Sequence, residues 1–462
     1  MTRFYITLIC IGVMILSGCT LGPNYTKPAA PVPVEFKGNK DWKIAEPKDH
    51  LPKGKWWTIF GDDVLNTLEE QAGDANQSLK AAMARVTQAR AAAGIAGSEL
   101  FPTVEMNPSA RRFRTDTGGG NMVTANLFSL PFDLSYEIDI WGRVRRSNQA
   151  AEAELTATAA DYTTVLLTLQ ADLARNYFQI RALDKEIDIV DRTVSLREES
   201  LRMIESRFKN GYTGRLDLER AKTESASTQA EVAALRKTRG ELENSLAVLL
   251  GKPSSDFSLP PANLTTKVPE ITAGLPSSLL ERRPDVAAAE RRMASANARI
   301  GMAEAAFFPT IRLTGSAGYQ SGEASSLLDW NSRVWSLGPG ISLPIFNGGR
   351  NKANLERTKA AYDETVANYR QTVLKAVQET EDGLSGLHFL SEQEKAQDRA
   401  VQAAANAEQI SDERYKSGLV SYLDVVDAQR TALQARRAGI QIWGQQLVTT
   451  VKLVKALGGG WE

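Results

Sequence analysis

The chain has 462 residues, of which 42% are hydrophobic, and its 55 basic residues balance 55 acidic ones. This length can bury a large core, whereas the balanced charge lacks the basic excess that is typical of nucleic-acid-binding proteins. Its two cysteines, Cys10 and Cys19, both lie near the amino terminus, which excludes a disulfide framework through the body.

Residues 1–18 have the organisation of a secretory signal peptide. Arg3 precedes an apolar run from Phe4 to Leu16 that is too short to span a membrane comfortably. The sequence Leu16-Ser17-Gly18-Cys19 resembles the bacterial lipobox, which implies cleavage before Cys19 and its acylation by diacylglycerol and a fatty acid. In the lipoproteins that this motif resembles, an Asp after the acylated cysteine favours retention in the inner membrane. Thr20 at that position therefore favours sorting to the outer membrane. An ordinary signal peptide with an incidental cysteine is the alternative.

Residues 19–73 are expected to form the acylated terminus, a tether and an equatorial segment. Between Leu21 and Lys55, prolines at Pro23, Pro28, Pro31 and Pro33 favour an extended, semi-rigid chain. An apolar cluster follows, which we interpret as ordinary core rather than as a docking cluster or a ligand pocket. It comprises Trp56, Trp57, Ile59 and Phe60.

The segment between Gly142 and Gly211 contains no proline and no other glycine, so it is predicted to be one unbroken helix. About 67 residues at 1.5 Å each make a rod of roughly 100 Å. Its apolar residues repeat every seven positions, which indicates a left-handed coiled coil. The repeating positions are Leu166, Leu173, Ile180, Ile187, Val194, Leu201 and Phe208.

The second half of the chain repeats the first at an offset of 207 positions. We therefore predict an internal duplication, with repeat 1 at 74–251, an equatorial linker at 252–283, repeat 2 at 284–457 and an equatorial tail at 458–462. The superposed pairs include Phe101-Pro102 with Phe308-Pro309, Gly142-Arg143 with Gly349-Arg350, Gly211 with Gly418, and Leu216-Asp217 with Leu423-Asp424.

Two segments of the first repeat alternate with the period of two that is typical of a strand with one wet face. The stronger runs from Phe128 to Ile140 and places Asp133, Glu137 and Asp139 opposite its apolar positions. A looser alternation from Thr103 to Thr115 predicts the partner strand. The second repeat shows the same phase, so four strands per chain are expected. Its apolar positions are Trp335, Leu337, Pro339, Ile341, Leu343 and Ile345.

Four strands cannot close a barrel, and an open edge in lipid leaves backbone groups unpaired at several kcal/mol each. Three chains would pool twelve strands, with apolar faces toward outer-membrane lipid and the three acids toward a water-filled lumen. The predicted fold is thus an α+β membrane protein: a long antiparallel α-helical coiled-coil barrel, plus four transmembrane β-strands per chain that close a 12-stranded β-barrel in a homotrimer. A soluble sandwich is the alternative.

The ends of the long helices are predicted to turn at Asn210 to Gly214 and at Ser417 to Ser421, where glycines permit a tight reversal. Asp424, Asp427 and Arg430 follow at spacings of three, on one helix face. Three-fold symmetry would turn them into rings, and close carboxylates would attract cations and resist joint ionisation. For Asp424, capping of a helix that begins near Ser421 is an equal alternative.

Several motifs in combination resemble the TolC-type outer-membrane factors, and most closely the NodT-like, OprM-like efflux lipoproteins. They are the lipobox, Gly22-Pro23-Asn24-Tyr25, Glu281-Arg282-Arg283-Pro284-Asp285-Val286, Pro344-Ile345-Phe346-Asn347-Gly348-Gly349-Arg350, and the run from Tyr422 to Arg430. The resemblance covers essentially the whole chain. It implies a trimeric, passive outer-membrane exit duct that meets a periplasmic membrane-fusion adaptor and an inner-membrane pump of the resistance-nodulation-division (RND) type, in a Gram-negative bacterium.

The resemblance also assigns roles at the tips. Asp427 and Arg430 match the gating Asp and Arg of the family, Asp424 with Asp427 matches its constriction pair, and Tyr415 matches a tyrosine that ties the closed state. Val420 departs from an arginine that some members carry. The predicted adaptor-docking residues are Gly211, Tyr212, Gly214, Leu216, Asp217, Gly418, Val420 and Leu423.

The two tips are not equivalent, because Arg220 stands in the first copy where the second has Asp427. We hypothesise that the second hairpin moves and that the first mainly receives the adaptor.

Other classes of function fit less well. Two distant histidines, scattered carboxylates and the absence of a phosphate-binding glycine loop argue against an enzyme, a cofactor or a metal site. A lipid-anchored periplasmic coiled-coil scaffold and the exit channel of a type I secretion system are the alternatives to an efflux duct. The dispersed methionines indicate no soft-metal relay, so drugs, metals, solvents and dyes are all compatible cargo.

Overall fold

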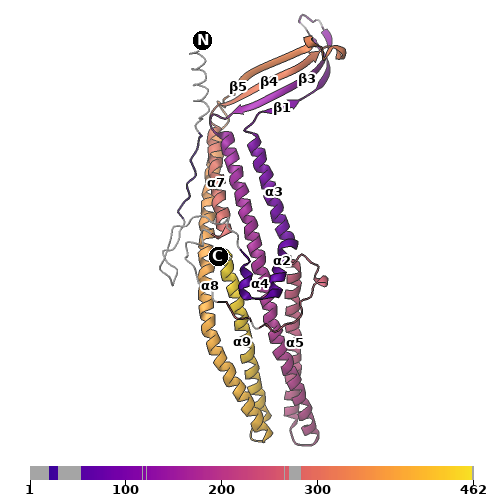
Figure 1. Cartoon of the computed structure of the whole chain (residues 1–462), viewed down its shortest axis with the longest axis vertical. Coiled ribbons are helices and arrows are strands. Elements are labelled where there is room, and N and C mark those ends of the chain that lie inside the picture. Colours follow the sequence, from indigo (N-terminus) through magenta and orange to yellow (C-terminus); the bar gives the residue numbers. More distant parts are fainter. Residues whose placement is uncertain are drawn as a thin grey trace. The chain divides into compact units, whose positions relative to one another are not determined.

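The computed structural model describes residues 20–29, 54–116, 118–120, 122–264, 266–269 and 282–459 (Figure 1). The predicted signal peptide, Cys19 and the last three residues of the predicted tail lie outside the described residues. The described chain divides into two compact units. The sheet unit contains 20–29, Ala84–Ala159 and Ala288–Gln371, and the tip unit contains the rest.

The helices of the two repeats have equal lengths and related positions. Each boundary in the first set becomes the boundary in the second when 207 is added, so the duplication holds in the structure, and the predicted long helix is confirmed. The pairs are α3 (Gln77–Ser98) with α7 (Pro284–Ala305), 22 residues each; α4 (Arg143–Lys209) with α8 (Arg350–Lys416), 67 each; and α5 (Arg215–Leu249) with α9 (Tyr422–Ala456), 35 each.

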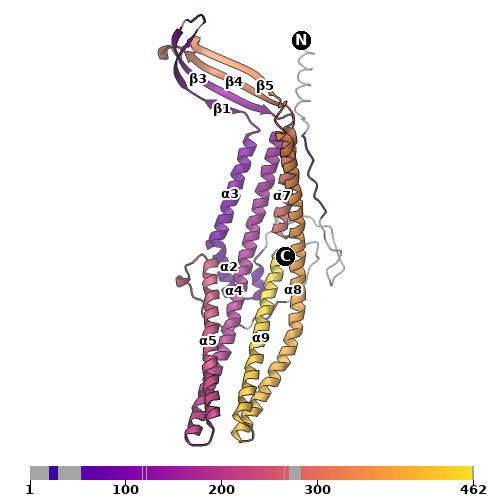
Figure 2. The same ribbon diagram turned by 180° about the vertical axis from the view of Figure 1, so that it is seen from behind.

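In the tip unit, α4 and α5 form one helical hairpin and α8 and α9 form the other, as both views of the ribbon show (Figure 2). Where these helices pass one another, the backbones come close: a Cβ added at Gly444 of α9 would lie 2.8 Å from the Cβ of Ala182 in α4. Within the described residues, no helix is both long enough and apolar enough to cross a bilayer.

The sheet unit holds one antiparallel sheet. β1 (Thr103–Met106) and β2 (Ser109–Asp116) pair with successive parts of β3 (Met122–Ile138), which pairs with β4 (Thr310–Ser321), which pairs with β5 (Arg333–Ser342). The strand predicted over Thr103–Thr115 is therefore broken, because Pro108 between its halves has no N–H for the ladder. Because β1 and β2 lie one after the other along β3, the five strands occupy four places across the sheet, which is the number of strands predicted per chain.

The register gives the sheet one apolar and one polar face, because directly opposed residues point to the same side. We call these the apolar face and the polar face. Leu134 of β3 lies opposite Gly315 of β4, which lies opposite Leu337 of β5, all on the apolar face. On the polar face Asp133 lies opposite Glu105 and Ser316, and Glu137 lies opposite Arg312.

Two strand predictions extend too far. Asp139 was expected on the strand, but β3 ends at Ile138, and the Asp139 carboxylate accepts from the backbone N–H groups of Val144 (3.2 Å) and Arg145 (2.9 Å). Asp139 thus caps the positive end of α4. Similarly, β5 ends at Ser342, so Leu343 and Ile345 lie beyond it.

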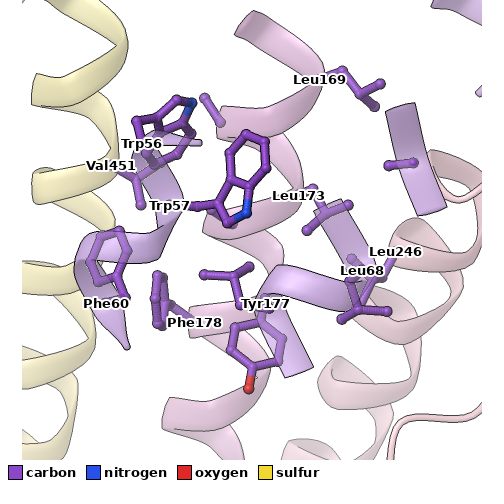
Figure 3. Close-up of a cluster of buried hydrophobic side chains, with 14 of the residues drawn as sticks. Trp56, Trp57, Phe60, Leu68, Leu169, Leu173, Tyr177, Phe178, Leu246 and Val451 are labelled. Carbon is purple, nitrogen blue, oxygen red and sulfur yellow. The ribbon is translucent and has the colours of Figure 1, made fainter. Parts of the chain in front are cut away.

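The apolar cluster after the tether is core, as interpreted. Trp56, Trp57 and Phe60 of the short helix η1 (Trp56–Phe60) are buried, and the Phe60 ring lies 4.6 Å from that of Phe178 in α4 (Figure 3). Ile59 is 40% exposed and is not part of the cluster. The following helix α2 (Asp63–Ala75) adds Leu65 and Leu68.

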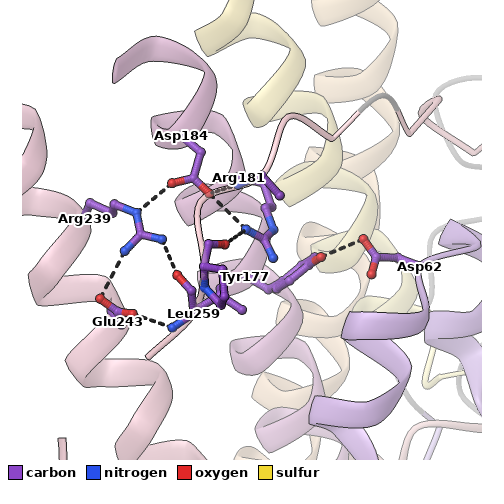
Figure 4. Close-up of polar contacts among 9 residues, drawn as sticks. Asp62, Tyr177, Arg181, Asp184, Arg239, Glu243 and Leu259 are labelled. Carbon is purple, nitrogen blue, oxygen red and sulfur yellow. Dashed lines mark hydrogen bonds and ion pairs between the residues drawn. The ribbon is translucent and has the colours of Figure 1, made fainter. Parts of the chain in front are cut away.

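A polar layer adjoins this core in the tip unit. Tyr177 donates to Asp62 at 2.7 Å, and Asp184 of α4 pairs with Arg181 at 3.0 Å and with Arg239 of α5 at 2.6 Å (Figure 4). Arg239 also pairs with Glu243 at 3.1 Å. Arg181, Asp184 and Arg239 each have an opposite charge beside them, which offsets much of their desolvation cost, whereas Asp62 accepts hydrogen bonds from Tyr177 and from the Leu65 N–H.

Candidate functional site at the helical tips

Both hairpins reverse through the same turn. Gly211 (φ 78°) and Gly418 (φ 74°) occupy the left-handed region, which glycine adopts without strain. In each turn a backbone hydrogen bond closes the end of the long helix: Tyr212 N–H donates to the Arg207 carbonyl at 2.8 Å, and Leu419 N–H donates to the Arg414 carbonyl at 2.9 Å. The turns expose apolar side chains, since Tyr212 is 81% and Leu419 is 74% exposed.

The returning helices begin differently. At α9, Ser421 and Asp424 form a reciprocal capping box, and the Asp424 carboxylate accepts from the Ser421 hydroxyl at 2.6 Å and its N–H at 2.8 Å. These hydrogen bonds lower the pKa of Asp424. At α5 the cap residue Gly214 has no side chain, and Asp217 accepts from Thr213 at 2.9 Å instead. In the single chain, Asp424 therefore caps the start of α9, which is the alternative to a role in the constriction.

An apolar cluster joins the two hairpins near their tips. Tyr422 and Val426 of α9 pack with Ile204 of α4 and with Leu218 and Ala221 of α5, and all five are buried. Tyr415, the predicted latch, lies at the edge of this cluster. Its ring is 5.8 Å from the Tyr422 ring, and the Arg207 guanidinium lies 5.2 Å from its centre. Tyr415 therefore contacts both hairpins.

Glu224 of α5 forms an electrostatic contact between the two hairpins. Its carboxylate pairs with Arg197 of α4 at 3.0 Å and accepts from Arg430 of α9. Arg197 also donates to Thr228 and to the Glu224 carbonyl. Glu224 and Arg197 are buried, whereas the Arg430 side chain is 53% exposed. A carboxylate of the first hairpin is thus shared between its own arginine and one from the second.

The same pairing recurs seven residues along both helices. Arg437 of α9 pairs with Glu231 of α5 and, at 2.7 Å, with Glu186 of α4. Seven residues is two helical turns, so the pairs lie on one stripe of each helix. Sequence reasoning assigned Arg430 but missed Glu224, Glu231 and Arg437. The equal spacing of the two acids and the two arginines was the available signal.

The remaining predicted residues have separate places. Asp427 is exposed, and its charge helps to raise the pKa of Arg430, after the larger effect of the Glu224 hydrogen bond. Leu216 and Leu423 are exposed, and Val420 is half-buried. In the sheet unit, Glu137 pairs with Arg143 at 2.7 Å, and Asp133 accepts from Asn107 at 3.4 Å. The described part of the chain has no cluster of three metal-ligating side chains.

Comparisons with known proteins match the whole chain. A family model described as outer membrane efflux protein matches residues 68–252 and again 275–459. The cation efflux system protein CusC of Escherichia coli O6:H1 (strain CFT073) is 31% identical over 453 residues, 97% of each chain. The solvent efflux pump outer membrane protein SrpC of Pseudomonas putida is 34% identical over 467 residues, 99% of this chain and 98% of SrpC. The solved outer-membrane channel OprN superposes with a TM-score of 0.86 at 31% identity, over 96% of this chain and 100% of that one.

Proposed function

Because the chain belongs to the outer membrane efflux protein family, we propose how its parts build and control an exit duct. The chain is the outer-membrane component of an RND-type efflux system, extends into the periplasm and conducts substrates without transforming them, so it is not an enzyme. The assembly, lipid anchor, gate and docking surface are the proposed details.

The proposal of a trimer rests on the two unpaired edges of the sheet. Among the strands that the structure describes, β5 pairs only with β4, and β1 and β2 pair only with β3. In lipid such edges would leave backbone groups unpaired, so β5 of one chain pairs with β1 and β2 of the next. Three chains then close twelve strands, with the apolar face toward lipid and Asp133 and Glu137 toward the lumen.

The trimer is tested on protein extracted from outer membranes in detergent. We expect a mass of three chains, a heat-dependent shift to the monomer on gels, and discrete conductance steps in planar bilayers. A stable monomer without conductance would instead favour the periplasmic scaffold.

Acylation of Cys19 is proposed from the lipobox, and the position of Thr20 supports it. Gly142, just before α4, has φ 80°, and a Cβ there would lie 2.6 Å from Thr20 Cγ2. Leu21 N–H donates to the Trp141 carbonyl at 3.0 Å. The chain that follows Cys19 therefore starts beside the junction of β3 and α4, where attached acyl chains would meet the bilayer. Mass spectrometry of the mature amino terminus tests this.

For the gate, we propose that the shared Glu224 carboxylate holds the second hairpin against the first in the closed state. Opening moves α9 with Arg430, while Arg197 keeps Glu224 neutralised. Tyr415 and the acids at Asp424 and Asp427 line the same end, and three-fold symmetry makes rings of them. The exposed tips at Gly211 to Asp217 and Gly418 to Leu423 receive the periplasmic adaptor, which carries the pump. Cross-linking from cysteines at Tyr212 and Leu419 to the adaptor tests this docking.

A further inference from the structure

Three arginines at the far end of the sheet lie on its apolar face. Arg112 and Arg114 of β2 are opposite Asn126 and Thr124, which share the even-numbered face of β3 with Phe128 and Leu134. Arg333 of β5 is opposite Tyr319 of β4, on that same face. Arg112 and Arg114 therefore point to the side that the proposed function turns toward lipid.

These arginines are exposed. Within the described residues, no carboxylate forms an ion pair with Arg112 or Arg114. The nearest acid on their strand face, Asp116, accepts from the Gly118 N–H at 2.9 Å. Arg333 donates to the Trp330 carbonyl at 2.7 Å and stacks on the Trp330 ring. In the part of the chain that the structure describes, these three charges have no acidic partner. On β5, Arg333 shares its face with Trp335, which is 80% exposed.

The length of the sheet places Arg333 near the outer rim of the apolar band that would cross the membrane. From Ile311 to Tyr319 β4 advances eight residues, about 26 Å along the strand and about 20 Å across the bilayer at the usual tilt, close to the ~25 Å apolar band of outer-membrane barrels. Tyr319, Trp335 and Arg333 then lie at the upper rim, where aromatic side chains gather and a charge can meet headgroups. Arg112 and Arg114 lie at the same, outer end of the sheet but farther out, because they are opposite Asn126 and Thr124, four and six residues beyond Leu130, which is opposite Tyr319.

The arginines lie on the two edge strands, β2 and β5. In the proposed trimer these edges pair between neighbours, so each seam brings Arg112 and Arg114 of one protomer to the side of a neighbour's Arg333. The inference therefore rests on the proposed function.

We propose that each seam of the trimer binds the phosphate groups of the phosphorylated glycolipid of the outer leaflet through Arg112, Arg114 and the neighbour's Arg333. Guanidinium groups match phosphate oxygens in a two-pronged geometry, and a lipid phosphate would supply negative charge to arginines that form no ion pair within the described residues. The acyl chains of the same lipid would cover the apolar residues below.

The test measures lipid binding to the detergent-purified trimer by native mass spectrometry. The probe is bisphosphorylated lipid A, compared with its dephosphorylated form, with phosphatidylglycerol and with inorganic phosphate. The variants are Arg112→Gln with Arg114→Gln, and Arg333→Gln alone. Arg111→Gln is the matched control, because Arg111 is equally exposed on the same strand but lies opposite Leu127, on the polar face.

We expect the trimer and the Arg111→Gln control to retain lipid A, and the double variant to lose about tenfold or more in affinity. Arg333→Gln should weaken binding as well, since one seam uses both edges. Equal binding by the double variant and the control, with the trimer intact, overturns the inference alone. Equal retention of dephosphorylated lipid A also overturns it, as does binding of phosphatidylglycerol or free phosphate in preference to lipid A. A monomeric chain overturns the proposed function and the shared seam together.

Discussion

The exposed guanidinium of Arg430 in α9 donates to the buried carboxylate of Glu224 in α5, and this contact joins the two hairpins. Removing Arg430 and removing Glu224 should have different effects on the remaining charges. Glu224 retains a second cation, Arg197, when Arg430 is removed, whereas Arg197 is buried and loses its carboxylate when Glu224 is removed.

Replacing the two partners should therefore separate gating from stability. Arg430→Ala should raise channel conductance in planar bilayers while lowering the free energy of unfolding by no more than about 1 kcal/mol, because its side chain is solvated. Glu224→Ala should also raise conductance but cost about 3–5 kcal/mol, because a buried cation is left unpaired.

The matched control is Arg436→Ala. Arg436 pairs with Glu408 at 2.7 Å within the second hairpin, so its loss should leave conductance unchanged. Equal effects of Arg430→Ala and Arg436→Ala on conductance would argue against a gating role for the shared carboxylate.

Neutralising Asp424 and Asp427 together should raise single-channel conductance, because a ring of close carboxylates would hold cations that block the constriction, and the neutral variant would release them. Asp427→Asn alone should give most of the change, since the Asp424 carboxylate is engaged by Ser421. An unchanged conductance in the double variant would count against the predicted acid ring.

The capping box predicts a pH effect at α9. Hydrogen bonds from Ser421 lower the pKa of Asp424, so the cap stabilises α9 above the ordinary carboxyl pKa and is lost as pH falls through the lowered value. Ser421→Ala should move the Asp424 titration back toward its ordinary range, measured by carboxyl chemical shifts. Identical titrations in both proteins would contradict this role for Ser421.

Two glycines of α9 should respond in opposite directions to alanine, because Gly444 faces the other hairpin and Gly439 faces α8 of its own. Gly444→Ala places a Cβ 2.8 Å from that of Ala182, so overpacking should cost about 1–3 kcal/mol against a gain of about 1 kcal/mol in helix propensity. Gly439→Ala is the control, because its Cβ would meet the nearest atoms at 3.9 Å and should only stabilise α9. Thermal unfolding measures both. A higher melting temperature for Gly444→Ala would show that α4 and α9 need no close approach.

Glu69 in α2 is a buried carboxyl group with no hydrogen-bond partner among the described residues. Burial raises the pKa of Glu69 well above the ordinary carboxyl value of 4.5. The native state then keeps a proton that the unfolded chain releases, so the free energy of unfolding falls as pH rises above about 4.5. Glu69→Leu should raise stability at pH 7 by roughly 1–3 kcal/mol and change it little at pH 4.

The neighbouring Glu70 provides the comparison for this effect. Its side chain is 57% exposed and pairs with Lys55, so Glu70→Leu should leave the pH dependence of melting unchanged. The same pH profile for both variants would rule out Glu69 as its source.

Helix lengths and strand alternation could be predicted from the sequence because they depend on local periods. The glycines at Gly142 and Gly211 bound α4, and the shift by 207 positions carried that prediction to α8 and α9. Strand ends were less accurate. Pro108 breaks an edge strand, and Asp139 leaves β3 to cap a helix, since a side chain chooses between a ladder and a free helix end only once both are in place.

The sequence by itself determined the duplication, the long hairpins, the alternating strands and the turns at the tips, since each follows from residues close together in the chain. Only the tertiary structure decided that Arg430 meets Glu224, 206 positions away, and that Glu231 and Arg437 repeat the contact. The physical reason is that a helical period shows which residues share a face, whereas the partner of that face depends on how the hairpins pack.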